Sequence, residues 1–263
     1  MLPLAATDLP TSLEALADAL ESGLKKHGIT AKGVKVSGGT YPAVNELTLD
    51  LTGATVTRET RLPVAKANRD DGVTVAHFSL KAAPLRLEKT PVRLTLEAHD
   101  TRLKFGQDEK KQAALVLTAA GKGEVEVQVQ RGDVEELIRS MAAEAAAEHG
   151  VDIKDVRLAV ATQGPRAVSF RAEVKAKMFV MSATITVSGE ATIDDQLNAR
   201  VSNLKCSGDG MIGNLASGFI KPYFDKIERN PIALMALPLG PVKLRDISLE
   251  AGEALTLSAK FSS

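Results

Sequence analysis

The feature that most constrains the fold of this chain is an alternation of apolar and polar residues that recurs along most of its length. A period of two places successive side chains on opposite faces of a strand, so one face is dry and the other wet. This pattern is typical of antiparallel sheets and not of parallel sheets that are buried on both faces. Clear examples are residues 47–51, 92–96, 125–129, 183–187 and 254–258.

Three segments have the spacing of amphipathic helices instead, at residues 12–27, 133–149 and 209–229. The first begins with a candidate capping box at residues 11–14, and glycine follows the first two helices at Gly28 and Gly150. Pro222 lies inside the third and is expected to kink it. The fold class predicted is α+β, with a long, strongly curved antiparallel sheet wrapped around amphipathic helices.

The chain also contains an internal match. Residues 26–29 (Lys-His-Gly-Ile) resemble residues 148–151 (Glu-His-Gly-Val), and the alternating residues after them agree as well. The match covers residues 12–52 and 134–175, about 122 residues apart. It predicts a single domain built from two pseudo-repeats, at about 10–130 and 131–263. The alternative is a chance match between two common helix-and-hairpin units.

Composition excludes several classes of function. The 33 basic and 33 acidic residues cancel, and the chain has no Trp and two Tyr, so neither charge nor base stacking favours a nucleic-acid partner. The single cysteine, Cys206, excludes an internal disulfide framework and a thiolate metal site. No apolar run approaches the ~20 residues that span a bilayer.

A G-x-G-x-x-G motif at residues 208–213 is the sharpest chemical signal. Only fifty residues follow it and the strand before it alternates, so it does not fit a dinucleotide-binding domain. It is interpreted as a flexible turn between strand and helix. A weaker hypothesis is that the backbone amides of Gly208, Gly210 and Gly213 hold one lipid phosphate.

No nucleophile or zinc-protease motif is present, so the sequence predicts a protein that is not an enzyme, with no catalytic residue, no cofactor and no metal. Two of the four histidines, His27 and His149, end helices, where a cationic ring suits the helix dipole. His77 and His99 lie on or beside strands and are candidates to be neighbours, interpreted as partly exposed histidines and not as ligands. The pairs 70–71 and 194–195 (Asp-Asp) are interpreted as turns, and residues 108–111 as a polar loop.

The capped helix that leads into long alternating strands resembles the tubular lipid-binding (TULIP) superfamily. So does the last third of the chain, with a strand at 196–205, a kinked apolar helix at 211–229, an apolar linker at 232–239 and closing strands at 242–250 and 254–261. The likeness is to a module of the bactericidal/permeability-increasing protein and to small bacterial phospholipid-binding proteins. It implies a curved sheet around a long helix, with an apolar groove for acyl chains. The chain lacks the disulfide of the animal members and an evident export signal.

The expected function is therefore non-enzymatic binding or transport of phospholipid or another long-chain hydrophobic ligand, with transient contact to a membrane surface. The alternative is a ligand-free structural or assembly module, with a protein partner that the sequence does not identify. Residues 1–6 are too short and lack the basic region of a signal peptide. The chain is thus cytoplasmic as written, or periplasmic or in the cell envelope if it is a mature exported form. The apolar residues expected to line the groove are Ile212, Leu215, Phe219, Ile220, Tyr223, Phe224, Ile227, Met235 and Leu237.

Overall fold

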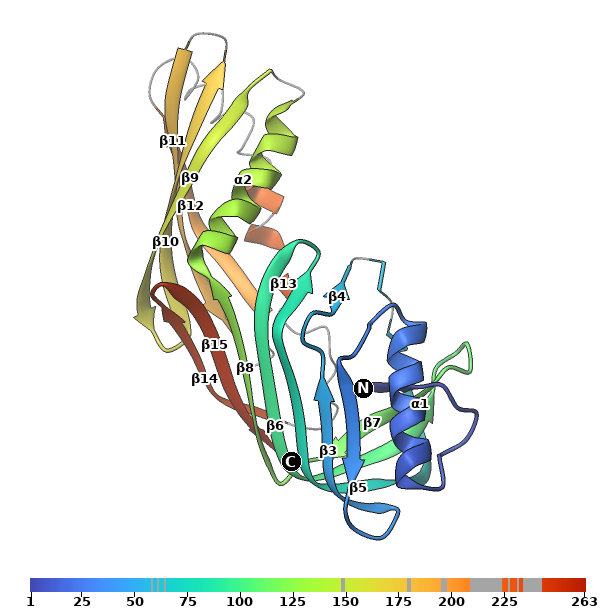
Figure 1. Ribbon diagram of the computed structural model, residues 1–263. Helices are drawn as coiled ribbons and strands as arrows, with labels where there is room; N and C mark the ends of the chain where they lie inside the picture. Colours follow the sequence, from blue (N-terminus) through green and yellow to red (C-terminus); the bar gives the residue numbers. More distant parts are fainter. Residues whose placement is uncertain are drawn as a thin grey trace. The chain divides into compact units, whose positions relative to one another are not determined.

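The computed structural model of the protein consists mostly of strands, with few helices (Figure 1). It describes residues 1–57, 59–60, 62–63, 65–147, 150–178, 181–194, 198–208, 224–226, 228–230, 232–233 and 243–263. The chain divides into two compact units. Unit 1 comprises Met1–Gln128, Leu237–Asp246 and Ser258–Ser263, and unit 2 comprises Val129–Ala236 and Ile247–Leu257.

Two sheets contain the strands. The larger sheet has the order β14-β15-β8-β6-β5-β3-β2, with β1, β4 and β7 beside this path, and the smaller has the order β13-β12-β11-β10-β9. The strands of the larger sheet are β1 (Leu2–Leu4), β2 (Gly33–Ser37), β3 (Ala43–Asp50), β4 (Thr55–Val56), β5 (Lys66–Leu87), β6 (Thr90–Gln107), β7 (Ala113–Ala119), β8 (Lys122–Gln130), β14 (Lys243–Ala251) and β15 (Ala254–Ser262). Those of the smaller sheet are β9 (Asp152–Gly164), β10 (Ala167–Met178), β11 (Met181–Ile193), β12 (Asn198–Gly208) and β13 (Ile232–Ala233).

The prediction of long alternating strands is confirmed, but the prediction of wholly antiparallel pairing is wrong at one place. β5 has 22 residues and β6 has 18, and they pair antiparallel. On its other edge β5 pairs with β3 and β4, and both of these run parallel to it. Alternation reports which face of a strand is buried and not the direction of its neighbour, so it did not exclude this mixed sheet.

Helix α1 (Leu13–Lys26) forms where its spacing predicts a helix. The cap is Ser12, whose hydroxyl accepts a hydrogen bond from the Ala15 amide at 3.1 Å, so it lies one residue later than in the predicted capping box of Thr11 and Glu14. At the other end Gly28 has φ 77°, its amide donates to the Lys25 carbonyl, and the Ile29 amide donates to the Leu24 carbonyl. This pair of bonds is a Schellman motif, which needs a left-handed residue and therefore favours glycine.

Helix α2 (Arg131–Ala147) begins two residues before the predicted Asp133 and ends in the same way as α1. Gly150 has φ 65°, its amide donates to the Ala147 carbonyl, and the Val151 amide donates to the Ala146 carbonyl. The same glycine stop therefore closes both helices.

The two halves of the internal match each contain a helix followed by an antiparallel strand pair, α1-β2-β3 and α2-β9-β10. They differ at the next strand, because β3 pairs parallel with β5 whereas β10 pairs antiparallel with β11. An origin by duplication stays a prediction.

The long strands of unit 1 bury opposite faces at their two ends. The register between β5 and β6 is unbroken from Gly72 to Ala82, so odd- and even-numbered residues of β5 keep to opposite faces there. The buried residues are odd-numbered on one side of the His77–His99 pair and even-numbered on the other. They are Val73, Val75, Thr101, Leu103 and Phe105 on the first side, and Leu80, Ala82, Leu96 and Ala98 on the second.

Most of the predicted third helix, and the linker after it, lie outside the described residues. Residues 224–226 and 228–229 are helical. The strands around this segment are confirmed: β12 covers most of the predicted 196–205, and β14 and β15 cover the two closing strands within one or two residues.

Candidate ligand-binding face

One face of the smaller sheet, in unit 2, is apolar across four strands. Directly opposite residues share a face of a sheet, and the register places apolar residues opposite one another repeatedly. Ala172 of β10 lies opposite Leu158 of β9 and Val187 of β11, and Val187 lies opposite Cys206 of β12. The next row along the face contains Val156, Val174 and Ile185.

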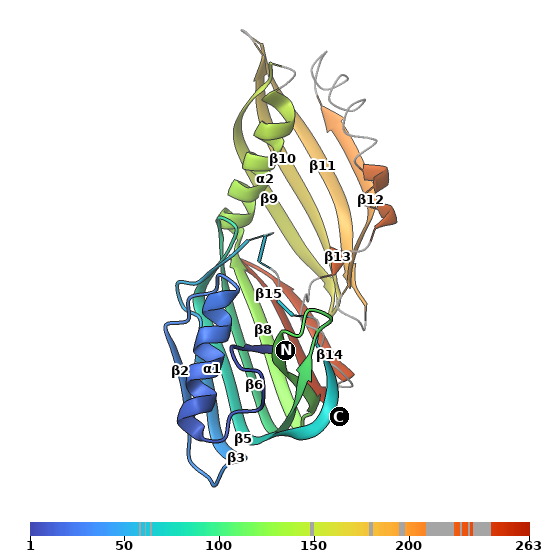
Figure 2. The same ribbon diagram turned by 90° about the vertical axis from the view of Figure 1, so that its right-hand side faces the viewer.

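Helix α2 covers the part of this apolar face that is nearest to β9 (Figure 2). Side chains on one face of α2, about three to four residues apart in sequence, pack on a buried cluster in the sheet. The Glu135 carboxylate on α2 also accepts a hydrogen bond at 2.8 Å from the Leu158 amide of β9, which is the edge strand. The buried cluster comprises Ile153, Val156, Val174, Ala176 and Ile185, and Ile138, Ala142, Ala143 and Ala146 of α2 pack against it.

The apolar face continues beyond α2 onto β11 and β12, where its residues are only half-buried. These are Val187, Leu204 and Cys206, of which Cys206 also packs against the buried cluster. Leu204 and Phe170 meet over Gly189, where an added Cβ would lie 2.9 Å from an atom of each side chain. This half-buried part of the face therefore contains aliphatic, aromatic and thiol groups. We call Val187, Leu204 and Cys206 the open apolar face.

The segment that the sequence predicted to line a groove begins directly after β12. Its far end returns to the same strand, because Glu228 accepts a hydrogen bond from the Leu204 amide at 2.9 Å and β13 pairs with Asn198 and Ala199. Of the predicted lining residues only Phe224 is described, and it is half-buried. The others, Ile212, Leu215, Phe219, Ile220, Tyr223, Ile227, Met235 and Leu237, lie outside the described residues.

The hypothetical phosphate contact is described only in part. Gly208 is the last residue of β12 and lies opposite Ile185. Gly210 and Gly213 are outside the described residues.

A row of polar residues crosses the larger sheet in unit 1. Register pairs join Ser37 to Glu46, Glu46 to His77, His77 to His99, and His99 to Lys122. The two imidazole rings stack with centroids 5.0 Å apart and an interplanar angle of 26°, which confirms that these histidines are neighbours.

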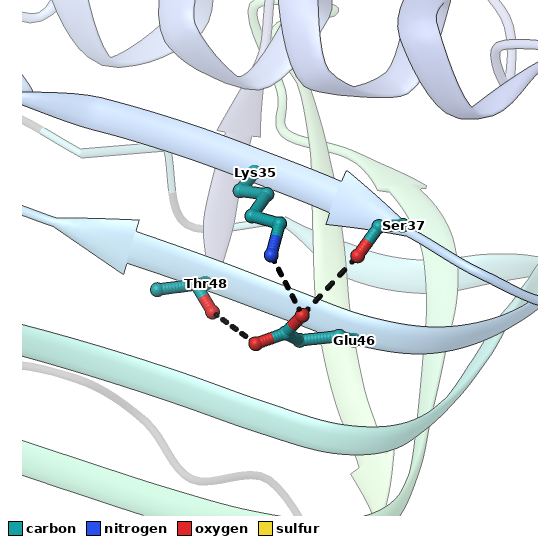
Figure 3. A network of polar contacts seen from close by, with 4 residues as sticks. All are labelled: Lys35, Ser37, Glu46 and Thr48. Atoms are coloured by element: carbon teal, nitrogen blue, oxygen red, sulfur yellow. Dashed lines mark hydrogen bonds and ion pairs between the residues drawn. The ribbon is translucent and has the colours of Figure 1, made fainter.

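Glu46, a member of this row, accepts hydrogen bonds from three side chains (Figure 3). Its carboxylate accepts from Lys35 Nζ at 3.1 Å, from Ser37 Oγ at 3.2 Å and from Thr48 Oγ1 at 3.5 Å. The pKa of Glu46 is lowered. The largest cause is the hydrogen bond from Lys35, and the second is the hydrogen bond from Ser37. The sequence did not reveal this network, because its members come from two strands.

A shallow pocket of about 300 Å³ lies in unit 1 beside β5 and β6. Arg69, on its wall, pairs with Asp8 at 2.8 Å and Asp71 at 2.9 Å, and Lys104 pairs with Asp70 at 2.8 Å. The two cations are therefore neutralised and leave little attraction for an anion. The pocket is lined by Ala67, Asn68, Arg69, Asp70, Lys104 and Thr118.

The prediction of a turn at Asp70 and Asp71 is wrong, because both residues lie within β5 at a register shift between Ala67 and Gly72. Two adjacent aspartates are compatible with a β-bulge as well as with a turn. The Asp71 Oδ1 and Tyr41 Oη atoms are buried without a hydrogen-bond partner among the described residues. The pKa of Tyr41 is raised, mainly by burial of the hydroxyl and secondly by the negative charge of Asp71.

The remaining predicted turns are borne out where they are described. Asp194 accepts a hydrogen bond from the Asn198 amide at 2.9 Å, and Asp108 accepts from the Lys110 and Gln112 amides. His27 is the C-cap of α1, while Glu148, His149 and Asp195 lie outside the described residues.

Three absences concern only the part of the chain that the structure describes. Within it no three His, Cys, Asp or Glu side chains are grouped to hold a metal ion. In the same part, no helix has the length and apolar character needed to cross a membrane. Cys206 forms no disulfide.

No family model, no curated protein and no solved structure matches this chain.

Proposed function

We propose that the protein binds or carries a long-chain hydrophobic ligand, such as a phospholipid, without catalysing a reaction. The observation that carries the proposal is the open apolar face of the smaller sheet, where Val187, Leu204 and Cys206 are only half-buried although the same face is buried under α2. An acyl chain laid against such a face would gain about 0.8 kcal/mol for each methylene removed from water.

The sequence around this face supports the same proposal. The segment after β12 is rich in apolar residues and glycine, and Glu228 and β13 hold its far end beside β12. A strongly curved sheet that encloses an acyl chain, as in the TULIP superfamily, is part of the proposal.

Cys206 offers a direct test, because it is the only cysteine of the chain and lies opposite Val187 on the open apolar face. The gently purified full-length protein is first examined by native mass spectrometry for a bound species, which is then extracted with organic solvent and identified. The rate of thiol modification of Cys206 is then measured with and without oleic acid. Ligand that covers this face is expected to slow modification by about tenfold or more, because a thiol reacts only when a reagent can reach it.

A matched pair of variants tests the position of the ligand. Val187→Asp places a carboxylate on the apolar face and is expected to abolish protection of Cys206 and uptake of a fluorescent fatty acid. Thr186→Asp changes the neighbouring residue, which points to the other face of β11, and is expected to retain both. The Tm of each variant shows whether it is folded. Absence of bound lipid, of uptake and of protection in the wild type would refute the carrier function.

The second candidate is a structural or assembly module that binds no ligand. The return of Glu228 and β13 to β12 favours it, since it brings the chain's own segment to the sheet. In that case Cys206 reacts at the same rate with and without fatty acid, and Val187→Asp lowers stability without any effect on uptake.

A further inference from the structure

We propose that His77 and His99 form a surface site for one divalent transition-metal ion, Zn²⁺, Cu²⁺ or Ni²⁺. The ion would bridge β5 and β6. The pair lies in unit 1 and is independent of the ligand proposed for unit 2. The two histidines are 22 residues apart in sequence and become directly opposite neighbours only through the register of the two longest strands. Both side chains are half-buried.

The distance between the two ring centres is compatible with two ligands on one ion. A zinc ion lies about 2.0–2.1 Å from an imidazole nitrogen, and the ring centre is about 1.2 Å farther away. With an angle of about 90–110° between the two ligands, the ring centres are then about 4.5–5.2 Å apart. The observed separation of 5.0 Å lies within this interval, but the rings are stacked at 26°, so they must turn about their side-chain bonds before a nitrogen lone pair of each, which lies in the ring plane, faces the same ion.

The backbone keeps the two histidines opposite each other. Register pairs continue on both sides of the histidines, with Val75 opposite Thr101 and Ser79 opposite Glu97. Neutral imidazole is a good ligand for zinc, copper and nickel, and a chelate on two rigid strands loses little entropy when it binds.

The surroundings define the character of the site. Glu46 lies beside His77 in the register, but its carboxylate already accepts hydrogen bonds from Lys35, Ser37 and Thr48. Lys122 is opposite His99, and Glu97 is two residues from His99 on the same face. The site thus consists of two imidazoles, with water in the remaining coordination positions. Catalytic zinc sites use three protein ligands, so this pair is not a catalytic centre, but an ion bound here would contradict the sequence-based prediction of no metal.

The test is a calorimetric titration of the untagged full-length protein with ZnCl₂, and separately with NiCl₂, at a pH above the ordinary pKa of histidine. One ion is expected per chain. His77→Ala and His99→Ala are each expected to weaken binding by about tenfold or more, since even outer-shell changes weaken metal sites by about 10–100-fold. His27→Ala, at the C-cap of α1, is the control and is expected to leave the affinity within about twofold.

A second measurement does not depend on the variants being folded. In the wild type, Zn²⁺ is expected to shift the NMR resonances of the His77 and His99 rings and not that of His27, and to raise the Tm in proportion to the logarithm of its concentration. The variants His77→Asn and His99→Asn replace the alanine variants if those fail to fold. No saturable binding below about 1 mM, or an equal loss in His27→Ala, would overturn the site.

Discussion

At the scale of single residues, backbone conformation explains the ends of the helices. Gly28 and Gly150 have positive φ, and an added Cβ at either would meet no atom within 4 Å. Their role is therefore conformational and not one of packing, because only glycine adopts the left-handed region without a steric penalty.

Gly28→Ala is expected to lower the free energy of unfolding by about 1 kcal/mol, because alanine must adopt a left-handed conformation there. Gly132→Ala is the matched control: this glycine belongs to α2, has no positive φ and has space for a Cβ, so the change is expected to be neutral or slightly stabilising. Urea unfolding measures both. Equal effects at the two positions would contradict the Schellman assignment.

The pKa of Glu46 makes a second prediction at this scale. Lys35→Met removes the largest cause of the lowered pKa and is expected to raise it toward the ordinary value of glutamate, about 4.3. A lowered pKa stabilises the folded state above the unfolded-state pKa, and this contribution is lost as the pH falls through the lower folded-state value. The effect of Lys35→Met on stability is therefore expected at neutral pH and to shrink in acid.

NMR titration of the Glu46 side chain measures this pKa directly. Lys110→Met changes a lysine in the turn between β6 and β7 and serves as the control, with no change expected at Glu46. A Glu46 pKa that is the same in Lys35→Met and in the wild type would show that the hydrogen bond does not persist in solution.

At the scale of elements, α2 is held to the smaller sheet by one face. Ile138 packs against the buried cluster of β9–β11, whereas its neighbour Leu137 is 42% exposed. The helix is therefore stabilised by its contacts with the sheet and not only by its own hydrogen bonds.

Ile138→Ala is expected to lower the free energy of unfolding by about 1–3 kcal/mol, since the side chain is partly buried in the cluster. Leu137→Ala makes a similar truncation on the exposed side and is expected to cost less than about 0.5 kcal/mol. Chemical unfolding followed by circular dichroism compares the two. A larger loss for Leu137→Ala would mean that α2 packs through a different face.

At the scale of the whole molecule, the chain contains two compact units, and each of them has buried apolar residues. Strands β8, β14 and β15 each have residues in both units, so the chain passes between them several times. Proteins with more than one core commonly depart from two-state unfolding.

Differential scanning calorimetry is expected to give a calorimetric enthalpy larger than the van't Hoff enthalpy, because the two units need not unfold together. Val73→Ala in unit 1 and Val156→Ala in unit 2 are expected to shift different parts of the transition, since each removes methyl groups from its own core. A ratio of the two enthalpies close to one, with both variants shifting the whole transition, would show that the units unfold as one.

The sequence by itself determined the local structure of this protein. The strands, α1 and the glycine stops of both helices depend on contacts between residues a few positions apart, so their patterns are visible in the chain. The direction of β3 against β5, the change of buried face along β5 and β6, and the stacking of His77 on His99 were decided by the tertiary structure. The half-burial of Val187, Leu204 and Cys206 was also decided there, because alternation marks a fully buried face and a half-buried one alike. These features depend on contacts between residues distant in sequence, and local periodicity carries no information about which strand becomes the neighbour.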